Sequence, residues 1–528
     1  MADQNMYLSA DKFKFVHEGE RIHDKKFDDK PIGYFRDAWN RFRKSKASVV
    51  AAVIILLIIA YAFIAPLCID RDPTMMDTYY KRNPSRLSFL NIPGFMDGGV
   101  EKLGTDSVDE ASLIRFMGIG VGAMDKDGTG SFTLGEAMGT DLQPVLRVDD
   151  VMVQELPGKK FKNFFPARVD QYLAVGFLYK DIEQAEYHRI VAWQEETGIQ
   201  VLYPLTADNE HNPDYTNANN WYKMKKKGQM PVNINEKGKA VEQSYSLDLV
   251  LESNYEYDAE GNVRFYKPSG GGTLETCQYR VRILYYAYYQ YLNGCEPDYL
   301  LGTDSQGYDL ALRVASGIKL SLLIAICVSA INFILGAMYG AIEGYYGGTV
   351  DIVLCRITDI LSGVPFIVVA TLFQIHLAKQ SGPIVCLLFA YVLTGWIGTA
   401  GRVRTQFYRF KNQEYVMAAR TLGAKDSRII WKHIFPNTLG TIITSSALAI
   451  PGVILSESML SYLGIINLGS STTTSLGTLL SEAQGIWTLY PHLMIVPALV
   501  ISLLMVCFNL FGNGLRDAFN PALRGVEE

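Results

Sequence analysis

The sequence predicts a polytopic α-helical membrane protein with six transmembrane helices and a large α+β insertion between the first two. Two observations lead to this fold class. Six apolar runs, uncharged except for one acidic residue, are about as long as a helix needs to cross a bilayer core of about 30 Å. The segment of more than 200 residues after the first run has the mixed composition of a folded domain. One buried core helix can resemble such a run, but six together indicate membrane spans.

The first run follows 46 residues and is too long for the apolar part of a cleavable signal peptide. The last five runs belong to one membrane domain at 313–517. The predicted spans are 47–69, 320–340, 360–378, 384–401, 438–464 and 491–515.

Basic residues give the orientation, because Lys and Arg collect on the cytoplasmic side of membrane proteins. Residues 1–46 predict a basic amphipathic helix before the first span. Residues 401–437 hold eight basic and two acidic side chains, whereas residues 70–314 hold 25 basic and 36 acidic ones. We therefore expect a multi-pass protein of the cell (plasma) membrane. Its N-terminal segment, its loop at 413–437 and its tail at 518–528 should be cytoplasmic, and its insertion at 70–312 extracytoplasmic.

Within the insertion, residues 181–194 predict a helix. Residues 254–267 predict a hairpin, because alternating aromatic and apolar side chains flank an Asp-Ala-Glu-Gly-Asn turn. Residues 279–292 are aromatic-rich, and their type stays open. Leu-Gly-Thr-Asp-Ser occurs at 103–107 and again at 301–305, which is weak evidence for a duplication.

Catalytic motifs are absent from the sequence. It has no phosphate-binding Gly-x-x-x-x-Gly-Lys-Ser/Thr loop, no His-Glu-x-x-His and no Gly-x-Ser-x-Gly nucleophile elbow. The net charge of −5 leaves no positive excess for a nucleic-acid partner. We expect a chain that is not an enzyme and binds no cofactor of its own, so any energy-driven function needs an ATPase on another chain.

One cytoplasmic segment has the character of a docking element. Ala418 and Ala419 lie on a short predicted helix that Gly423 ends as a C-cap, which leaves one helix face bare. A second amphipathic helix should follow and stop at Pro436, with its apolar face formed by Ile429, Ile430, His433 and Ile434. A bare face lets another protein approach closely. A basic loop held on lipid headgroups is the alternative.

This segment resembles the "EAA" coupling loop of ATP-binding-cassette importer permeases. Its form is similar to the C-type permease subunit of oligopeptide/dipeptide importers. The matching loop residues are Glu414, Ala418, Ala419, Gly423, Ile430, His433 and Pro436, while Met417 stands where the family usually has Glu. Gly302–Asp309 resembles the family's Gly-Thr-Asp-x-x-Gly-x-Asp lead into span two. Further matches are Trp39, Phe42, Arg43, Gly347, Gly348, Asp351, Arg356, Asp359, Ile360, Pro365, Glu457, Ser461, Leu463 and Gly464.

The resemblance covers roughly residues 30–70 and 296–525 and implies the type I ABC importer permease fold. It implies a sister permease subunit, two ATP-binding subunits that use ATP-Mg, and an extracellular peptide-binding lipoprotein that delivers oligopeptides or dipeptides. The lipid bilayer is the remaining partner. Import of another small solute, such as a metal chelate, and a membrane-anchored extracellular receptor are the alternatives. The resemblance says nothing of the insertion.

Several polar or small residues in the spans are candidates for structural or pathway roles. Arg356 and Asp359 are three residues apart and can pair, as a structural clamp or as part of a gate. Glu457 has no obvious local partner, so it lines the pathway or reaches water at the interface. Small residues spaced by four allow close helix packing, within the chain or between subunits, and form a stripe at Gly336, Gly340 and Gly344.

The insertion contains one candidate metal site and one candidate disulfide. Asp125, Asp127, Thr129, Ser131 and Glu136 have the spacing of ligand positions in a calcium loop. Their glycine-rich flanks are poor helices, so a polar surface turn is the alternative, and any calcium affinity should be weak. Cys277 and Cys295 are the two cysteines of the insertion, and free thiols are favoured over a bridge.

Overall fold

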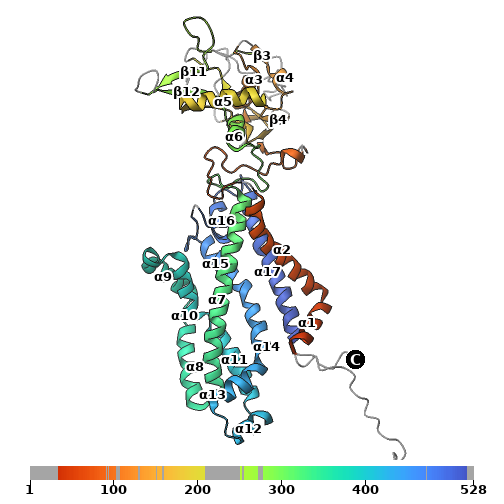
Figure 1. Ribbon diagram of the computed structural model, residues 1–528, viewed down its shortest axis with the longest axis vertical. Coiled ribbons are helices and arrows are strands. Elements are labelled where there is room, and N and C mark those ends of the chain that lie inside the picture. The colour runs from red at the N-terminus through yellow and green to blue at the C-terminus, as the bar shows by residue number, and fades with distance from the viewer. Residues whose placement is uncertain are drawn as a thin grey trace, which may run out of the picture.

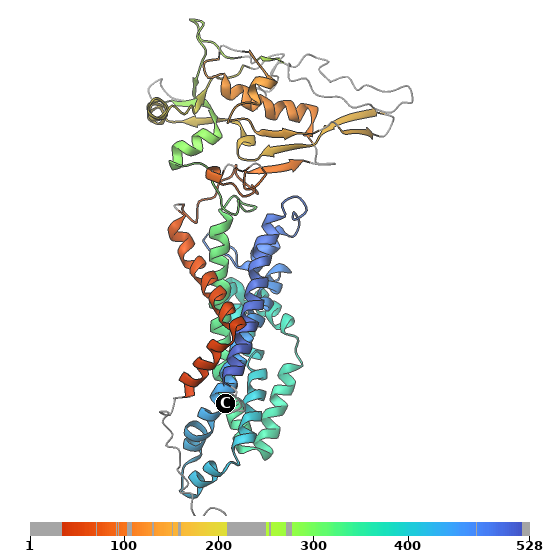
Figure 2. The same cartoon turned by 90° about the vertical axis from the view of Figure 1, so that its right-hand side faces the viewer.

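The computed structural model describes residues 34–519, apart from 70, 91, 93, 103–107, 129–130, 150–151, 157–159, 208–249, 253–254, 271–276 and 471. Its long helices form an elongated bundle, which we call the membrane bundle (Figure 1). The chain between the first two spans forms a separate inserted domain over one end of this bundle. Figure 2 shows this domain extending beyond the bundle on one side.

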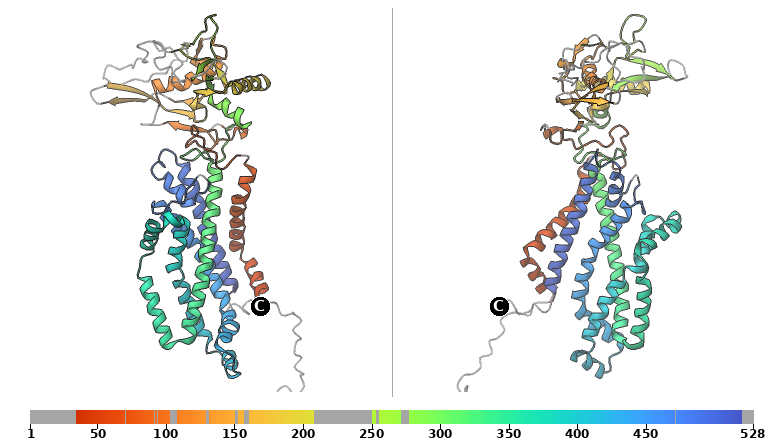
Figure 3. Two further views of the ribbon diagram at one scale, coloured as in Figure 1. Left: turned by 60° about the vertical axis from the view of Figure 1, so that its left-hand side comes forward. Right: turned by 180° about the vertical axis from the view of Figure 1, so that it is seen from behind.

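The membrane bundle begins with α1 (Tyr34–Lys44) and α2 (Lys46–Cys68) and ends with α17 (His492–Phe519), which packs beside both. Figure 3 shows α8 and α9 on the far side of the bundle from α2. The remaining elements are α7 (Leu310–Tyr346), α8 (Gly348–Ser362), α9 (Phe366–Ser381), α10 (Pro383–Thr394), α11 (Ile397–Phe410), α12 (Glu414–Thr421), α13 (Asp426–Arg428), the π-helical turn η5 (Ile429–Ile434), α14 (Phe435–Ala447), α15 (Ala449–Tyr462) and α16 (Leu476–Ala483).

Five helical segments of the described chain are long and apolar enough to cross a membrane, and they include α2, α7 and α17. The third predicted span, at 360–378, is different. It consists of α8 and α9, which meet at a bend of 70°. The prediction of one continuous span at 360–378 is therefore wrong. Pro365 has no N–H and disfavours helical geometry in the residue before it, so the helix breaks there.

The predicted stop at Pro436 is also wrong, because the helix continues through this residue into α14. The preceding turn, η5, is wider than an α-helix: the N–H of Phe435 donates to the carbonyl of Ile430, five residues back. A π-turn of this kind accommodates a residue that cannot follow the regular hydrogen-bond pattern. Residues 426–462 thus count as one candidate span.

The inserted domain has the predicted α+β composition, and its described residues form four small antiparallel sheets. One sheet has the order β1–β7–β4, with β1 (Gly99–Lys102), β7 (Ala167–Asp170) and β4 (Val145–Val148). The others are β2–β6–β5 (Val108–Asp109, Lys160–Phe165, Met152–Leu156), β10–β3 (Val250–Glu252, Ser131–Thr133) and β11–β12–β8 (Tyr266–Ser269, Gln278–Leu284, Phe177–Ile182), with β9 (Leu202–Tyr203) also paired to β12. The helices are α3 (Glu110–Met124), α4 (Leu134–Ala137), α5 (Gln184–Thr197) and α6 (Tyr285–Asn293).

The element predictions within the insertion are largely confirmed. The expected helix at 181–194 is α5, which begins three residues later. The expected hairpin is present, with the N–H of Asp258 donating to the carbonyl of Asn262 across its turn. The undecided aromatic segment is the strand β12 followed by the helix α6. The repeat at 103–107 lies outside the described residues.

A tyrosine-rich core holds the inserted domain together. Tyr80, Tyr172 and Tyr289 are almost fully buried, and the ring of Tyr80 packs against both of the others. Aromatic rings bury large apolar areas, and their edge-to-face contacts add to that stabilisation. The membrane bundle has its own separate apolar core.

The loop Gly302–Asp309 joins the inserted domain to α7. Asp304 Oδ1 accepts hydrogen bonds from three successive backbone N–H groups at 2.9 Å each. Asp309 caps α7 by accepting from the N–H of Ala311, and its other oxygen pairs with Arg71 at 3.1 Å. Burial raises the pKa of Asp309 above its ordinary value, although Arg71 and the backbone donors act in the opposite direction. The loop is therefore a rigid joint between the two parts of the molecule.

Candidate functional site: the coupling end of the bundle

The helix α12 lies at the end of the membrane bundle opposite the inserted domain (Figure 1). One of its faces is accessible and apolar, with Leu422 88% exposed just past its end. We call this face the coupling surface and define it as Tyr415, Ala418, Ala419 and Leu422, which recur at helical spacing. Two alanines leave its centre without bulky side chains, so another protein can approach the backbone closely.

Gly423 ends α12 as predicted. Its φ of +77° lies in the left-handed region that favours glycine. The N–H of Ala424 donates to the carbonyl of Ala419 at 3.1 Å, which is the long hydrogen bond of a Schellman cap. A side chain added at Gly423 would meet nothing within 4 Å. Backbone conformation, and not space, therefore selects glycine here.

The opposite face of α12 rests on the bundle. Val416 is fully buried in a cluster with Phe407, Ile429 and Ile434. Arg420 donates to the Tyr345 hydroxyl at 3.5 Å, and that hydroxyl donates to Asp426 at 2.6 Å. The coupling surface is thus connected to the end of α7 through direct contacts.

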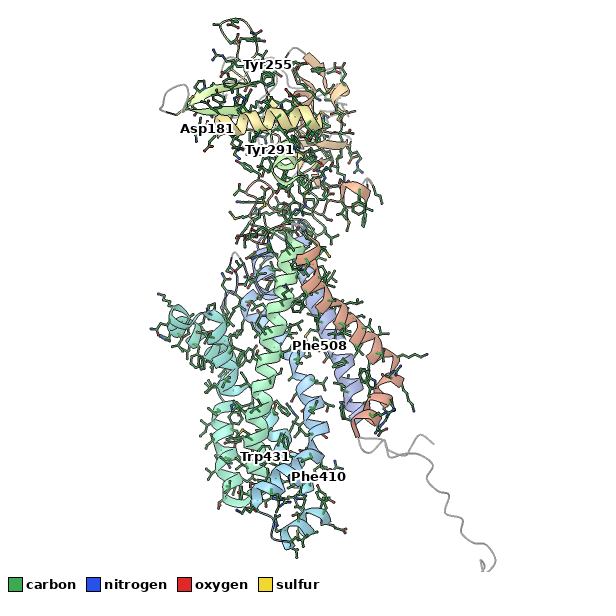
Figure 4. All side chains as sticks on the ribbon, viewed as in Figure 1. Asp181, Tyr255, Tyr291, Phe410, Trp431 and Phe508 are labelled. Carbon is green, nitrogen blue, oxygen red and sulfur yellow. The ribbon has the colours of Figure 1, made fainter. Side chains whose placement is uncertain are left out.

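The predicted loop residues differ in their exposure to solvent. Glu414 is exposed in the first turn of α12, where its negative charge stabilises the helix by interacting with the helix dipole. Ile430 is buried beneath the coupling surface, and His433 is half-buried beside it. Pro436 is exposed within the continuing helix. Trp431, from the same π-turn, is 45% exposed and lies near this end of the bundle (Figure 4).

Sequence reasoning missed the ion-pair cluster that braces this end. Arg404 on α11 contacts both carboxylate oxygens of Asp351 on α8, at 2.5 and 2.7 Å. It also lies 3.5 Å from Glu343 on α7, and Tyr408 donates to Asp351 at 2.8 Å. Glu343 and Asp351 are both buried. A charged residue near the end of the second predicted span was the available signal, but its partner is distant in the sequence.

Comparison with known proteins identifies the family of the chain. Residues 334–525 match the family model described as "Binding-protein-dependent transport system inner membrane component". Residues 33–88 match "N-terminal TM domain of oligopeptide transport permease C". Between them, residues 89–333 match neither model.

Two curated relatives come from Bacillus subtilis (strain 168). The oligopeptide transport system permease protein OppC is 39% identical over 237 residues, which is 44% of this chain and 76% of that protein. The dipeptide transport system permease protein DppC is 39% identical over 43% of this chain and 70% of that protein. The chain belongs to the OppC/DppC family of ABC importer permeases. It is a multi-pass membrane permease subunit of an ABC importer and is not itself catalytic.

A more distant likeness is to a solved structure of the MetNI methionine ABC transporter in inward-facing conformations. It has a TM-score of 0.33 and 15% identity, and it covers 40% of this chain and 98% of that chain.

The glycine stripe of the permease serves packing within the chain. Gly336, Gly340 and Gly344 on α7 face α11, and a Cβ at Gly340 would lie 2.2 Å from the carbonyl oxygen of Ala400. Such a distance is impossible without moving a backbone. The alternative of a contact between subunits is therefore not needed to explain these glycines.

The charged candidates in the permease spans lie in contrasting settings. Arg356 and Asp359 form the predicted pair at 3.3 Å, but their side chains are 77% and 56% exposed, so the pair is no buried clamp. Glu457 is only 1% exposed and accepts hydrogen bonds from Ser321 and Ser461 at 3.1 Å each. The expectation that Glu457 lacks a local partner is wrong, because serines on α7 and on its own helix provide the donors. Within this chain it does not reach water.

The calcium loop stays a prediction. Thr129 lies outside the described residues, as does the side chain of Ser131. Glu136 accepts from the N–H and hydroxyl of Thr133 at 2.7 and 2.8 Å, which lowers its pKa. Asp125 is buried and accepts from the Tyr255 hydroxyl, while Asp127 is exposed. In the part of the chain that the structure describes, no group of three His, Cys, Asp or Glu side chains is placed to hold a metal.

Cys277 is buried and its Sγ lies 3.7 Å from Gln184 Nε2, whereas Cys295 is exposed, and the two are not joined by a disulfide in the structure. Unbridged cysteines stay the favoured prediction.

Proposed function

We propose that this permease and a sister permease form the membrane pathway of an ATP-driven importer of short peptides. An extracellular peptide-binding lipoprotein delivers the peptide on the side of the inserted domain. Two ATP-binding subunits supply the energy, and one of them docks on the coupling surface. The names of the relatives, which are oligopeptide and dipeptide permeases, support peptides as the substrate class.

The observation that carries the proposal is the position of the coupling surface. It is exposed and apolar, and it lies at the end of the bundle opposite the inserted domain. The distribution of basic residues supports a cytoplasmic location for this end, since residues 401–437 carry eight basic and two acidic side chains. An ATPase in the cytoplasm reaches only this side.

The contacts around α12 provide a route for the coupling. A partner that pushes on Ala418 and Ala419 also moves Val416 and Arg420, because all four lie on one short helix. Val416 is packed against α11 and the π-turn, and Arg420 contacts Tyr345 at the end of α7. Movement of the partner is therefore passed to two membrane helices through packed side chains and not through a flexible loop.

The proposal is tested with two substitutions in the coupling surface and its cap. Gly423→Asp introduces a charge at a left-handed position, and Ala419→Trp fills the bare face. We expect both variants to enter the membrane at normal levels, to lose peptide uptake and to weaken association with the ATPase in pull-down of the purified complex.

The matched control is Gly423→Asn, because asparagine tolerates the left-handed conformation and adds no charge. This variant should retain most of its uptake. Normal uptake by both Gly423→Asp and Ala419→Trp would contradict the coupling role. It would favour a basic loop that merely contacts lipid headgroups.

A further inference from the structure

A cleft of about 640 Å³ opens on the inserted domain, over the face of the β1–β7–β4 sheet. Residues 86–88, 92, 94 and 96–97 form one wall, and residues 140–143 form another. Except for its rim at 86–88, the cleft lies in the part of the chain that matches neither family model. Its volume is within the range of small-molecule binding sites, which is about 300–1,000 Å³.

Two arginines lie side by side on the floor of this cleft. Arg147 on β4 is directly opposite Arg168 on β7 in the strand register, so their side chains share one face of the sheet. Like charges in this position destabilise a sheet. The carboxylate of Glu101, on β1, lies 3.3 Å from Arg147 and 3.7 Å from Arg168 and offsets part of that cost. Asp149 pairs with Arg147 and Asp97 pairs with Arg168, so carboxylates of the chain offset the charge of both arginines.

Arg147, and not Arg168, keeps a donor available for a ligand. Asp97 occupies Arg168 with two hydrogen bonds, at 2.6 and 3.0 Å, and this pairing is among the contacts that lower the pKa of Asp97 despite its partial burial. Arg147 is 55% exposed, and its contacts to Asp149 and Glu101 use Nε and Nη2. Within the described part of the chain, Nη1 of Arg147 donates to no protein atom. A guanidinium group with open donors is well suited to a carboxylate.

The rest of the lining includes apolar, neutral polar and negatively charged side chains, and one further arginine, Arg86, which pairs with Asp170 at 3.3 Å. Ile92 and Leu146 are 48% and 43% exposed on the walls, so apolar ligand groups can contact them. Asp141 is an exposed carboxylate on the side formed by residues 140–143. The cleft thus offers one arginine with an open donor, apolar walls and an anionic rim, while Arg86 and Arg168 are paired with Asp170 and Asp97. A short peptide has the complementary groups: a terminal carboxylate, apolar side chains and a terminal ammonium.

We propose that this cleft binds short peptides by their free C-terminal carboxylate at Arg147. The peptide's apolar side chains lie against Ile92 and Leu146, and its ammonium group faces Asp141. This inference rests on the proposed function, because it makes the inserted domain a second binding site for the imported peptides. A site fused to the permease keeps peptide near the mouth of the pathway at a raised effective concentration.

Binding is measured by calorimetry on the full chain in lipid nanodiscs, without ATPase or binding protein. The probe is the tripeptide Ala-Phe-Ala as the free acid and as the C-terminal amide. We expect saturable binding of the free acid and binding of the amide that is weaker by about tenfold or more, since a hydrogen bond to a charged group is lost. Arg147→Gln should weaken binding of the free acid by a similar factor.

Two further variants separate the cleft from general effects on the fold. Leu146→Trp fills the cleft and should abolish binding without removing a charge. Arg189→Gln removes an exposed arginine on α5, outside the cleft, and should leave binding unchanged. All three variants should retain the melting temperature of the parent protein within a few degrees.

Absence of saturable binding, or equal affinity of the parent, Arg147→Gln and Leu146→Trp, would overturn the proposal. So would a cleft that binds the purified peptide-binding lipoprotein and no peptide. The outcomes for the two proposals remain distinct. If the assembled importer takes up peptide but the isolated chain does not bind it, the cleft proposal is contradicted and the importer proposal still holds. Binding to the cleft together with normal uptake in both Gly423→Asp and Ala419→Trp contradicts the coupling role and leaves the cleft site.

Discussion

Arg404 connects three helices at the coupling end, because it contacts Asp351 on α8 and Glu343 on α7 from its own position on α11. Nothing near Arg404 in the sequence marks this role, since Asp351 is 53 residues away. The sequence showed instead the pair Arg356–Asp359, whose spacing on one helix guarantees proximity but not burial. Local spacing predicts neighbours on a helix. It does not predict which charges the fold buries.

Replacing Arg404 with Ala should therefore destabilise the permease much more than replacing Arg356. Arg404→Ala leaves two buried carboxylates without their guanidinium partner, which should lower the free energy of unfolding by roughly 3 kcal/mol. Arg356→Ala breaks an exposed pair and should cost less than about 1 kcal/mol. Thermal denaturation of the purified chains in detergent measures both. Equal destabilisation would mean that the two pairs are equally accessible.

Gly340 provides a second test at this scale. Gly340→Ile places a branched side chain where a Cβ alone would already overlap the carbonyl of Ala400. We expect α7 and α11 to separate, at a cost of about 1–3 kcal/mol or more, and the yield of folded protein to fall. The control is Gly401→Ala, where an added Cβ meets nothing within 4 Å. That change should be neutral or slightly stabilising, because alanine favours helix.

At the scale of elements, apolar run length predicted where the chain crosses the membrane but not how straight each helix is. The run at 360–378 is apolar throughout, yet the structure divides it between α8 and α9. At Pro436 the sequence predicted the end of a helix, but a π-turn lets the helix continue. Proline removes one hydrogen bond in both places. Whether the chain breaks or widens depends on the neighbouring backbone, which a hydropathy pattern does not contain.

The bend between α8 and α9 should depend on Pro365 together with Gly363. A double variant, Gly363→Ala with Pro365→Ala, restores an N–H and favours helix across the break. Spin labels at Ile352 and Leu372, both exposed, should then move further apart in pulsed electron resonance measurements. Pro66→Ala in α2, a helix that already contains its proline without a break, is the control and should leave the distance unchanged. An unchanged distance in the double variant would show that packing imposes the bend.

At the scale of the whole molecule, the division into a membrane bundle and an inserted domain was predictable because composition changes sharply at residues 70 and 310. The coupling loop was predictable because its alanines and glycine lie within a few residues of one another. The cleft was not. Its floor comes from β1, β4 and β7, three strands that are not adjacent in the sequence. The register that aligns Arg147 with Arg168 exists only after folding.

The orientation of the whole molecule has a direct test. In a cysteine-free background, Glu260→Cys lies on the exposed turn of the inserted domain and Lys425→Cys lies beside the coupling surface. On intact cells, a membrane-impermeant maleimide should label the first position and not the second. After the cells are opened, both should react. Labelling of Lys425→Cys alone on intact cells would invert the proposed topology.

The length of α7 has a mechanical consequence. This helix has 37 residues and no proline, so it is a continuous helix of about 55 Å whose two ends are both anchored. Asp309 fixes one end to Arg71 of the inserted domain, and Tyr345 fixes the other to Asp426 beneath α12. A rod of this length that tilts by about 5° about one end displaces the other end by roughly 5 Å. Small rotations at the ATPase side thus become movements of atomic size under the inserted domain, by leverage alone.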